Sequence, residues 1–266
     1  RAEGSSIGLV PTMGALHNGH LALVKEGLRQ NDVVVVSIFV NPTQFDNEED
    51  LIKYPRNFDA DVTLLSSESE TRIIVYAPSV EDIYGNTIIS EPFKFDGLEH
   101  EMEGAFRTGH FDGVGTIVKR LLEIVQPDYA YFGEKDFQQL QIIKKLVELN
   151  DISVSIVGCE IYRTEDGLAM SSRNERLTDA HRAVAPFIYR TLNTAKTKFG
   201  TKSAQSITDW VVKQFKKEPL LELEYFVIAD TKTLKPVKRK STKKTYRAFI
   251  AVYAGDIRLI DNIALN

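Results

Sequence analysis

Short apolar runs recur through the first part of the chain and predict the strands of a sheet. They contain few polar residues, such as Ser37 in the longest run. Runs this apolar are typical of strands that are covered on both faces, as in parallel α/β folds. The predicted strands are residues 7–10, 33–40, 73–77, 129–132 and 154–157.

Helical patterns lie between these runs. Residues 21–29 follow a turn that contains Gly and Asn, residues 114–125 stop before Pro127, and residues 137–149 end at Asn150. Strands that alternate with helices predict an α/β fold with a Rossmann-like, doubly wound parallel sheet. Ligands of such sheets bind beyond the carboxyl ends of the strands, so the segments after those ends are candidates for chemistry.

The pattern changes after about residue 161. Two helices are predicted at residues 178–199 and 203–217, the first with Thr178 and Asp179 as caps. Helices followed by consecutive strands predict a smaller α+β domain with a mainly antiparallel sheet. These strands are expected at residues 223–228, 246–253 and 257–263, and the expected domains are residues 1–160 and 161–266.

Composition places the chain among ordinary globular proteins, with 43% hydrophobic and 26% charged residues. No apolar run approaches the ~20 residues that cross a bilayer, and no signal-peptide pattern is present. The single cysteine, Cys159, excludes an internal disulfide, indicates a reducing compartment and is expected to be buried and inert. We therefore expect a cytoplasmic protein. Because the chain begins with Arg1, native residues are expected to precede it.

Charge is distributed unevenly. The formal net charge is −4, yet residues 231–247 contain eight basic residues and no acidic one. A run of this kind can bind a polyanion or form a solvated hairpin or loop. We interpret it as solvated surface and keep nucleic-acid binding as the alternative.

The segment PTMGALHNGH, residues 11–20, follows the first predicted strand and opens the first helix. Gly14 and Gly19 permit tight turns and a close approach of the backbone to a ligand. A helix N-terminus offers N–H groups and partial positive charge, which suit phosphate. His17 and His20 are three residues apart, so their imidazoles point the same way and can stabilise one phosphoryl group together.

Other interpretations of these histidines are a metal site or ordinary packing. A zinc site would need further ligands. Cys159 and the other histidines do not have the spacing of such ligands; they are His100, His110 and His181. The context of strand, turn and helix favours phosphate binding.

Two further motifs follow predicted strands or precede helices. In FVNPTQF, residues 39–45, the amides of Asn41 and Gln44 can bind a polar substrate, although Asn-Pro is also a turn signal. RTGHFDGV, residues 107–114, offers Arg107 and His110 to an anion, while Asp112 is equally suited to cap a helix.

Two more motifs carry cations. YFGEKDFQQL, residues 131–140, places Lys135 where a point charge can meet a polyphosphate. Asp136 fits a helix cap as well as a ribose or metal contact. DGLAMSSRN, residues 166–174, supplies two hydroxyls and a guanidinium, either on a surface loop or on a lid that closes over phosphates.

With the C-terminal RLIDN, these motifs occur in the order and spacing of the pantothenate synthetase family, within the HxGH nucleotidyltransferase superfamily. The chain resembles that family from about residue 7 to residue 262. The resemblance implies ATP-dependent condensation of (R)-pantoate with β-alanine through a pantoyl adenylate, releasing AMP and pyrophosphate. It also implies Mg²⁺ as a cofactor and a homodimer, with no nucleic-acid or membrane partner. The alternative is a nucleotidyltransferase that acts on another small acceptor.

Site residues follow from the resemblance. The implied catalytic residues are His17, His20, Lys135, Ser171, Ser172 and Arg173. The implied contacts to ATP add Met13, Gly14, Ala15, Leu16, Asn18, Gly19, Gly133, Glu134, Asp136, Tyr162 and Met170. The implied pantoate site comprises Gln44, Gln139 and Asn41 with an apolar wall of Pro11, Met13, Phe39, Val114, Val118 and Phe132.

The chain departs from the family pattern at a few positions. Tyr162 replaces a smaller residue that meets adenine, and Thr108 replaces a proline. Asp61 matches an acidic residue that is associated with Mg²⁺ in relatives, but Ala60 replaces its acidic neighbour, so the metal ligands are left unassigned. The resemblance further implies a mobile gate at residues 47–60.

Overall fold

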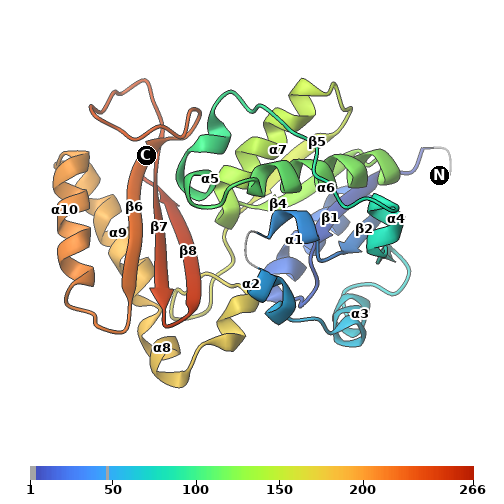
Figure 1. Ribbon diagram of the computed structural model, residues 1–266, viewed down its shortest axis with the longest axis horizontal. Helices are drawn as coiled ribbons and strands as arrows, with labels where there is room; N and C mark the ends of the chain where they lie inside the picture. The colour runs from blue at the N-terminus through green and yellow to red at the C-terminus, as the bar shows by residue number, and fades with distance from the viewer. Residues whose placement is uncertain (1–3, 46–47) are drawn as a thin grey trace. The chain divides into compact units, whose positions relative to one another are not determined.

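The computed structural model describes residues 4–45 and 48–266, which form two units (Figure 1). Unit 1 comprises the described part of Arg1–Glu134 together with Gln138–Glu160. Unit 2 comprises Ile161–Asn266 and the short segment Lys135–Phe137. That segment therefore packs with residues far along the chain, although its neighbours in sequence belong to unit 1.

A five-stranded parallel sheet forms the centre of unit 1, as predicted. Its strand order is β3-β2-β1-β4-β5, and every pairing is parallel. Strand order reverses at β1, between β2 and β4, and such a switch point is where open α/β sheets bind ligands. The strands are β1 (Ile7–Thr12), β2 (Val33–Ile38), β3 (Ile73–Tyr76), β4 (Tyr129–Gly133) and β5 (Ser155–Cys159).

Helices connect the strands of unit 1. The predicted helices are confirmed as α1 (Asn18–Gln30), α6 (His110–Val125) and α7 (Phe137–Leu149). Shorter helices that apolar spacing did not reveal are α2 (Glu48–Lys53), α3 (Phe58–Ser66), α4 (Val80–Tyr84) and α5 (Met102–Phe106). Single turns also occur in the described part of unit 1, at η1 (Pro42–Gln44) and η2 (Leu98–His100). The turn η3 (Glu134–Asp136) begins in unit 1 and continues into the segment Lys135–Phe137 of unit 2.

Unit 2 contains the predicted antiparallel sheet, in the order β6-β7-β8. Its strands are β6 (Glu222–Asp230), β7 (Tyr246–Ala254) and β8 (Ile257–Ala264). Alternate residues of β7, from Tyr246 to Ala254, join a hydrophobic cluster with α9 (Phe187–Phe199) and α10 (Ala204–Phe215). The intervening residues, such as Arg247 and Phe249, therefore point to the opposite face.

The prediction of one helix over residues 178–199 is wrong. The segment forms α8 (Asp179–Val184) and α9, which are separated at Ala185 and Pro186. Proline has no N–H to donate and its ring clashes with the preceding turn, so the helix breaks there. The predicted cap is confirmed, because Thr178 Oγ1 accepts from the His181 N–H at 3.3 Å.

The interpretation of the basic run as solvated surface holds for seven of its eight basic residues, whose side chains are exposed. The eighth, Arg247, is buried and only 8% exposed. Cys159 is half-buried rather than buried, and desolvation raises the pKa of its thiol to about 11, which favours the unreactive form. In the described part of the chain, we find no helix with the length and apolar character needed to span a membrane.

Candidate functional site

The histidine turn of unit 1 connects β1 to α1. Gly14 and Ala15 both adopt left-handed backbone conformations, with φ of 81° and 48°. His17 then caps α1: its Nδ1 accepts from the Gly19 N–H at 3.1 Å. In return, His20 Nδ1 accepts from the His17 N–H at 3.3 Å. The two histidines thus form a reciprocal capping box, a role usually filled by Ser or Thr with Glu.

This capping box determines which ring nitrogens can donate. A nitrogen that accepts a hydrogen bond carries no proton, so each neutral imidazole is protonated at Nε2. The rings of His17 and His20 are stacked, with centroids 4.1 Å apart. Two Nε2–H donors are therefore presented side by side at the N-terminus of α1, beyond the carboxyl end of a central strand.

Asp61, on α3, holds the same turn. Its two carboxylate oxygens accept from the Ala15 N–H at 3.0 Å and from the Leu16 N–H at 2.7 Å. The side chain is only 3% exposed. These bonds stabilise the left-handed conformation of Ala15, which costs free energy for a residue with a Cβ.

Asn41 and Gln44 lie in a polar cluster after β2. Gln44 Nε2 is 3.1 Å from Met13 Sδ, and its Oε1 accepts from Asn41 Nδ2 at 3.1 Å. Asn41 is 1% exposed and also donates to the Gly113 carbonyl at 3.1 Å. Its Oδ1 accepts from Tyr84 Oη at 2.5 Å. Asn41 is thus suited to orient Gln44, which is itself half-buried.

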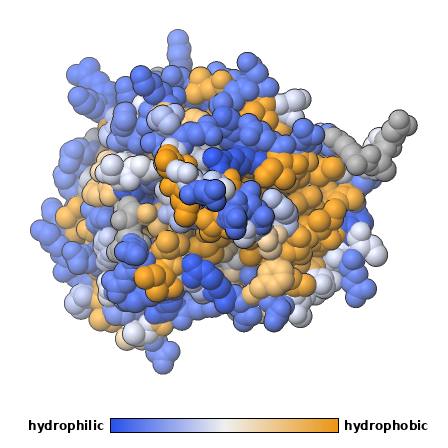
Figure 2. All heavy atoms as spheres, turned by 45° about the vertical axis from the view of Figure 1, so that its right-hand side comes forward, coloured by the Kyte–Doolittle hydropathy of each residue, from blue (hydrophilic) through white to orange (hydrophobic). Residues whose placement is uncertain are grey.

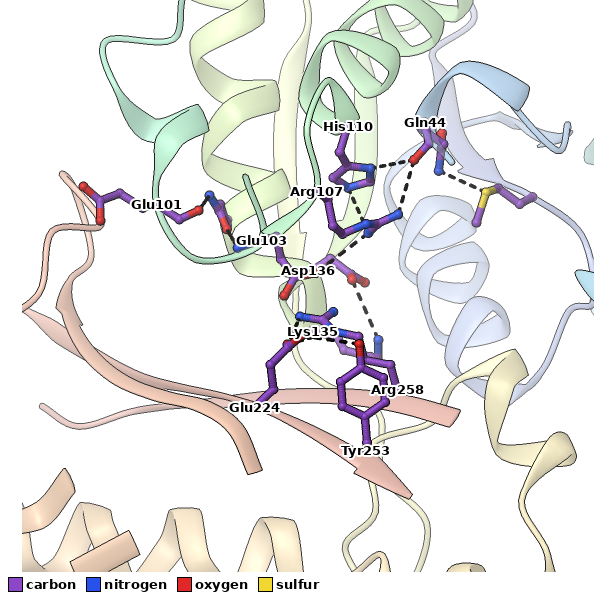
Figure 3. Close-up of polar contacts among 12 residues, drawn as sticks. Gln44, Glu101, Glu103, Arg107, His110, Lys135, Asp136, Glu224, Tyr253 and Arg258 are labelled. Atoms are coloured by element: carbon purple, nitrogen blue, oxygen red, sulfur yellow. Dashed lines mark hydrogen bonds and ion pairs between the residues drawn. The ribbon is translucent and has the colours of Figure 1, made fainter. Parts of the chain in front are cut away.

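Arg107 and His110 also converge on Gln44 (Figure 3). The Gln44 carbonyl oxygen lies 3.2 Å from Arg107 Nη2 and 2.9 Å from His110 Nδ1. His110 is buried. Asp112 does not cap α6, whose N-cap is Gly109; instead its Oδ1 accepts from the Phe93 N–H at 2.9 Å. The motif at residues 107–114 therefore fixes the main chain around Gln44.

Unit 1 also holds the predicted apolar wall. Phe39, Val114, Val118 and Phe132 are buried, and Pro11 and Met13 are half-buried. Gly133 is the last residue of β4 and Glu134 follows it, while Gln139 lies half-buried on the first turn of α7. Asn18 and Gly19 open α1. The structure thus brings the pantoate candidates together in one unit.

In unit 2, Lys135 is half-buried, with its ammonium 3.7 Å from the Asp136 carboxylate. The segment after residue 161 folds back on itself: the Met170 N–H donates to the Tyr162 carbonyl at 3.0 Å. Ser171 Oγ then accepts from the Arg173 N–H at 3.3 Å and caps the turn η4 (Ser172–Arg176).

The root of this loop is held by charge. Arg182 donates to the Asp166 carboxylate at 2.7 Å, and this bond, with one from Thr164, lowers the pKa of Asp166 to about 2. Ser172 is buried, whereas Arg173 is half-buried and Tyr162 is 43% exposed.

A resident metal site is not formed by these residues alone. In residues 4–45 and 48–266, no group of three or more His, Cys, Asp or Glu side chains could hold an ion. Both oxygens of Asp61 accept main-chain N–H bonds.

Comparisons with known proteins show the family of this chain. The family described as Pantoate-beta-alanine ligase matches residues 1–264. A pantothenate synthetase of Christiangramia forsetii is 59% identical over 100% of this chain and 94% of its own. The pantothenate synthetase of Flavobacterium psychrophilum is 60% identical over 98% of this chain and 92% of its own.

Solved structures give the same result. Pantothenate synthetase from Thermus thermophilus superposes with a TM-score of 0.91 at 39% identity, covering 98% of this chain and 93% of its own. Pantoate-beta-alanine ligase from Francisella tularensis, complexed with beta-gamma ATP and β-alanine, has a TM-score of 0.80 at 36% identity and covers 100% of this chain and 92% of its own.

Matches of this extent, on this fold, define the chain as an enzyme of the ligase class. It belongs to the pantoate–β-alanine ligase family.

Sequence patterns missed several positioning residues. The sequence suggests metal binding for Asp61 and anion binding for Arg107 and His110, whereas in the structure these side chains bond main-chain groups. The side chain of Asn262 bonds the main chain of Lys135, a contact that the C-terminal motif RLIDN does not indicate. Each of these contacts joins residues distant in sequence, so no local spacing reveals it.

Proposed function

We propose that this protein condenses pantoate with β-alanine, using ATP as co-substrate and passing through a pantoyl adenylate. Family membership supports the overall reaction, and the Francisella tularensis relative was solved with an ATP analogue and β-alanine. The observation that carries the adenylation step is the capping box of His17 and His20, with two Nε2–H donors beyond the carboxyl end of β1.

In the first step, a carboxylate oxygen of pantoate attacks the α-phosphorus and pyrophosphate leaves. This step brings two anions together, so donors must offset the repulsion. We assign that role to the two imidazoles with Lys135 and Arg173, while Ser171 and Ser172 donate hydroxyls. A donor placed in this way typically lowers the barrier by ~2.7–4 kcal/mol.

In the second step, the neutral amine of β-alanine attacks the acyl carbon and AMP leaves. The amide C–N bond forms, the bond between the acyl carbon and the bridging oxygen of the acyl–phosphate anhydride breaks so that this oxygen leaves with AMP, and the proton of the amine goes to solvent. AMP is a far better leaving group than oxide, which is why the carboxylate must first be activated. No covalent acyl-enzyme is required.

The proposed pantoate site combines amides with an apolar wall. Gln44 and Gln139 bind the polar groups of pantoate, and Gln44 also lies near β-alanine. The buried side chains of Phe39 and Phe132 with the other wall residues suit its gem-dimethyl group. The residues proposed to contact pantoate are amides and apolar side chains, which suit an acceptor that carries no phosphate. The gate at residues 47–60 stays a proposal: Asn47 lies outside the described residues, and the rest includes α2 and the start of α3.

We further propose a cytoplasmic homodimer that contacts through unit 1. Figure 2 shows apolar side chains gathered on the face that it brings forward. Edge strand β3 exposes Ile74 by 55%. Other large apolar residues exposed on unit 1 are Ile52, Phe58, Ile88, Ile89, Phe106, Ile124 and Leu149.

The test is AMP release measured with ATP and each acid or amine alone and together. We expect AMP only when pantoate and β-alanine are both present, and pyrophosphate exchange that pantoate alone stimulates. AMP formation with neither substrate, or exchange stimulated by a phosphorylated acceptor instead, would contradict the proposal.

A further inference from the structure

The C-terminal strand β8 carries two adjacent buried polar residues, Asp261 and Asn262, which are 5% and 1% exposed. Consecutive residues of a strand point to opposite faces of the sheet. Leu259 and Ile263 join the hydrophobic cluster of α9 and α10, so Asp261, between them, faces the helices. Asn262 therefore faces the other side.

Asn262 contacts the segment Lys135–Phe137 on that side. Its Nδ2 donates to the Lys135 carbonyl oxygen at 2.8 Å. Its Oδ1 accepts from Arg247 Nη1, and the Arg247 guanidinium lies 4.1 Å from the Phe137 ring centroid. The Phe137 ring in turn packs against Phe249, with centroids 5.9 Å apart. The main chain at Lys135 is thus held by side chains of β7 and β8.

The same face of the sheet carries further fixed polar groups. Glu224 accepts from Arg258 Nε at 2.9 Å and from Tyr253 Oη at 3.4 Å. In Figure 3, Lys135 and Asp136 are drawn on the side of the sheet from which these residues project. The face of the sheet on which Asn262 lies therefore carries polar side chains that bond one another.

Asp261 binds the segment that leads into the loop at residues 171–173. Arg163 donates to its two oxygens at 2.7 and 2.9 Å and to the Gly167 carbonyl at 3.1 Å. The Arg163 guanidinium also lies 3.7 Å from the Tyr189 ring centroid. Arg163 and Gly167 lie at the root of the loop that carries residues 171–173. One dipeptide of β8 therefore bonds both segments of unit 2 that carry the proposed phosphate contacts.

We propose that Asn262 is a positioning residue that places Lys135 for the reaction, with Asp261 doing the same for the loop before Ser171. This inference rests on the proposed role of Lys135 at the phosphates of ATP. Asn262 acts through the main chain of Lys135 and needs no contact with substrate. Its bond fixes where the ammonium can reach, and a displacement of about 1 Å in a catalytic group can cost roughly 100-fold in rate.

The test uses steady-state kinetics of the full chain with Asn262→Ala and Asn262→Asp. The aspartate keeps an oxygen toward Arg247 but cannot donate to the Lys135 carbonyl. We expect kcat/KM for ATP to fall by about 10-fold to 100-fold in both variants, with KM for pantoate nearly unchanged. The matched control is Asn266→Ala. The Asn266 side chain also bonds the main chain: its Oδ1 accepts from the Tyr246 N–H at 2.8 Å and its Nδ2 donates to the Lys244 carbonyl at 3.0 Å. This variant should retain full activity.

A double-mutant cycle with Lys135→Ala separates positioning from general damage. If Asn262 acts through Lys135, Asn262→Asp should add little loss in the Lys135→Ala background. Wild-type kinetics in Asn262→Asp with a crippled Lys135→Ala would overturn this inference alone, as would additive losses. Normal activity in Lys135→Ala would overturn both it and the proposed role of Lys135.

Discussion

The two units hold their proposed phosphate-binding residues by different means. In unit 1, the rings of His17 and His20 are oriented by main-chain groups two and three residues away. In unit 2, Lys135 is bonded by a residue 127 positions later, and Arg163 by one 98 positions later. The histidine turn is defined mainly by local sequence, whereas the lysine is placed only once the C-terminal sheet has formed. Asp61 gives the histidine turn a long-range contact within unit 1, 46 positions from Ala15.

The largest effect is expected from Asp261→Ala in unit 2. The substitution leaves the Arg163 guanidinium without its bidentate partner, and removing one member of a buried ion pair costs about 3–5 kcal/mol of unfolding free energy. Urea denaturation measures it. Asp256→Ala, which removes an exposed carboxylate 3.8 Å from Arg176, is the control and should change little. Equal stability of the two variants would contradict the claim that long-range contacts of β8 hold the proposed phosphate-binding segments of unit 2.

His20→Ala tests the local half of the comparison. Removing one donor from a phosphoryl group in the transition state should lower kcat about 100-fold to 1,000-fold. AMP release is the measurement, and circular dichroism checks that α1 persists. His100→Ala is the control, because that imidazole is 79% exposed. A near-normal rate in His20→Ala would remove the phosphate-binding turn from the mechanism.

Asp61→Asn tests whether the histidine turn depends on the two main-chain bonds that Asp61 accepts. An amide cannot accept both main-chain N–H bonds as a carboxylate does, so we expect a loss of about 1–3 kcal/mol in unfolding free energy. ATP binding should weaken as the turn loosens, while the dependence of the rate on Mg²⁺ concentration stays unchanged. Asp59→Asn, exposed on the same helix, is the control. A selective shift in Mg²⁺ dependence would instead make Asp61 a metal ligand.

The smallest effect is expected from Asp166→Asn, at the root of the loop in unit 2. The folded-state pKa is lowered from 3.8 to about 2, so the contribution to stability is complete above about pH 3.8 and is lost as the pH falls through 2. Because the pair is exposed, wild type and variant should differ by only ~0–1 kcal/mol near neutral pH. Urea titrations from neutral pH down to about pH 2 should show that gap closing; a gap that widened in acid would contradict the assignment.

Much of the fold could be predicted because its signals are local. Apolar runs marked all five strands of the parallel sheet, and helical spacing marked α6 and α7. Apolar spacing predicts one helix over residues 178–199, whereas Pro186 separates α8 from α9. The helices α2 to α5 are short and their apolar faces are small, so spacing alone could not separate them from loops.

The proposed site also contains residues that local sequence reveals and residues that only long-range contacts reveal. The turn at His17 and His20 was recognisable because strand, glycines and imidazoles are adjacent in sequence. Arg247 was counted with a surface run, although the alternation of β7 turns it toward Asn262 and Phe137. No periodicity connects Asn262 with Lys135, and only the folded sheet of unit 2 brings them together.

The most direct measurement follows the fate of the pantoate carboxylate oxygens. Pantoate labelled with a heavy oxygen isotope in its carboxylate is turned over with ATP and β-alanine, and the products are analysed by mass spectrometry. Attack on the α-phosphorus predicts that each AMP carries one labelled oxygen and that pyrophosphate carries none. Label in inorganic phosphate, accompanied by ADP, would contradict adenylation and with it the role given to the histidine turn.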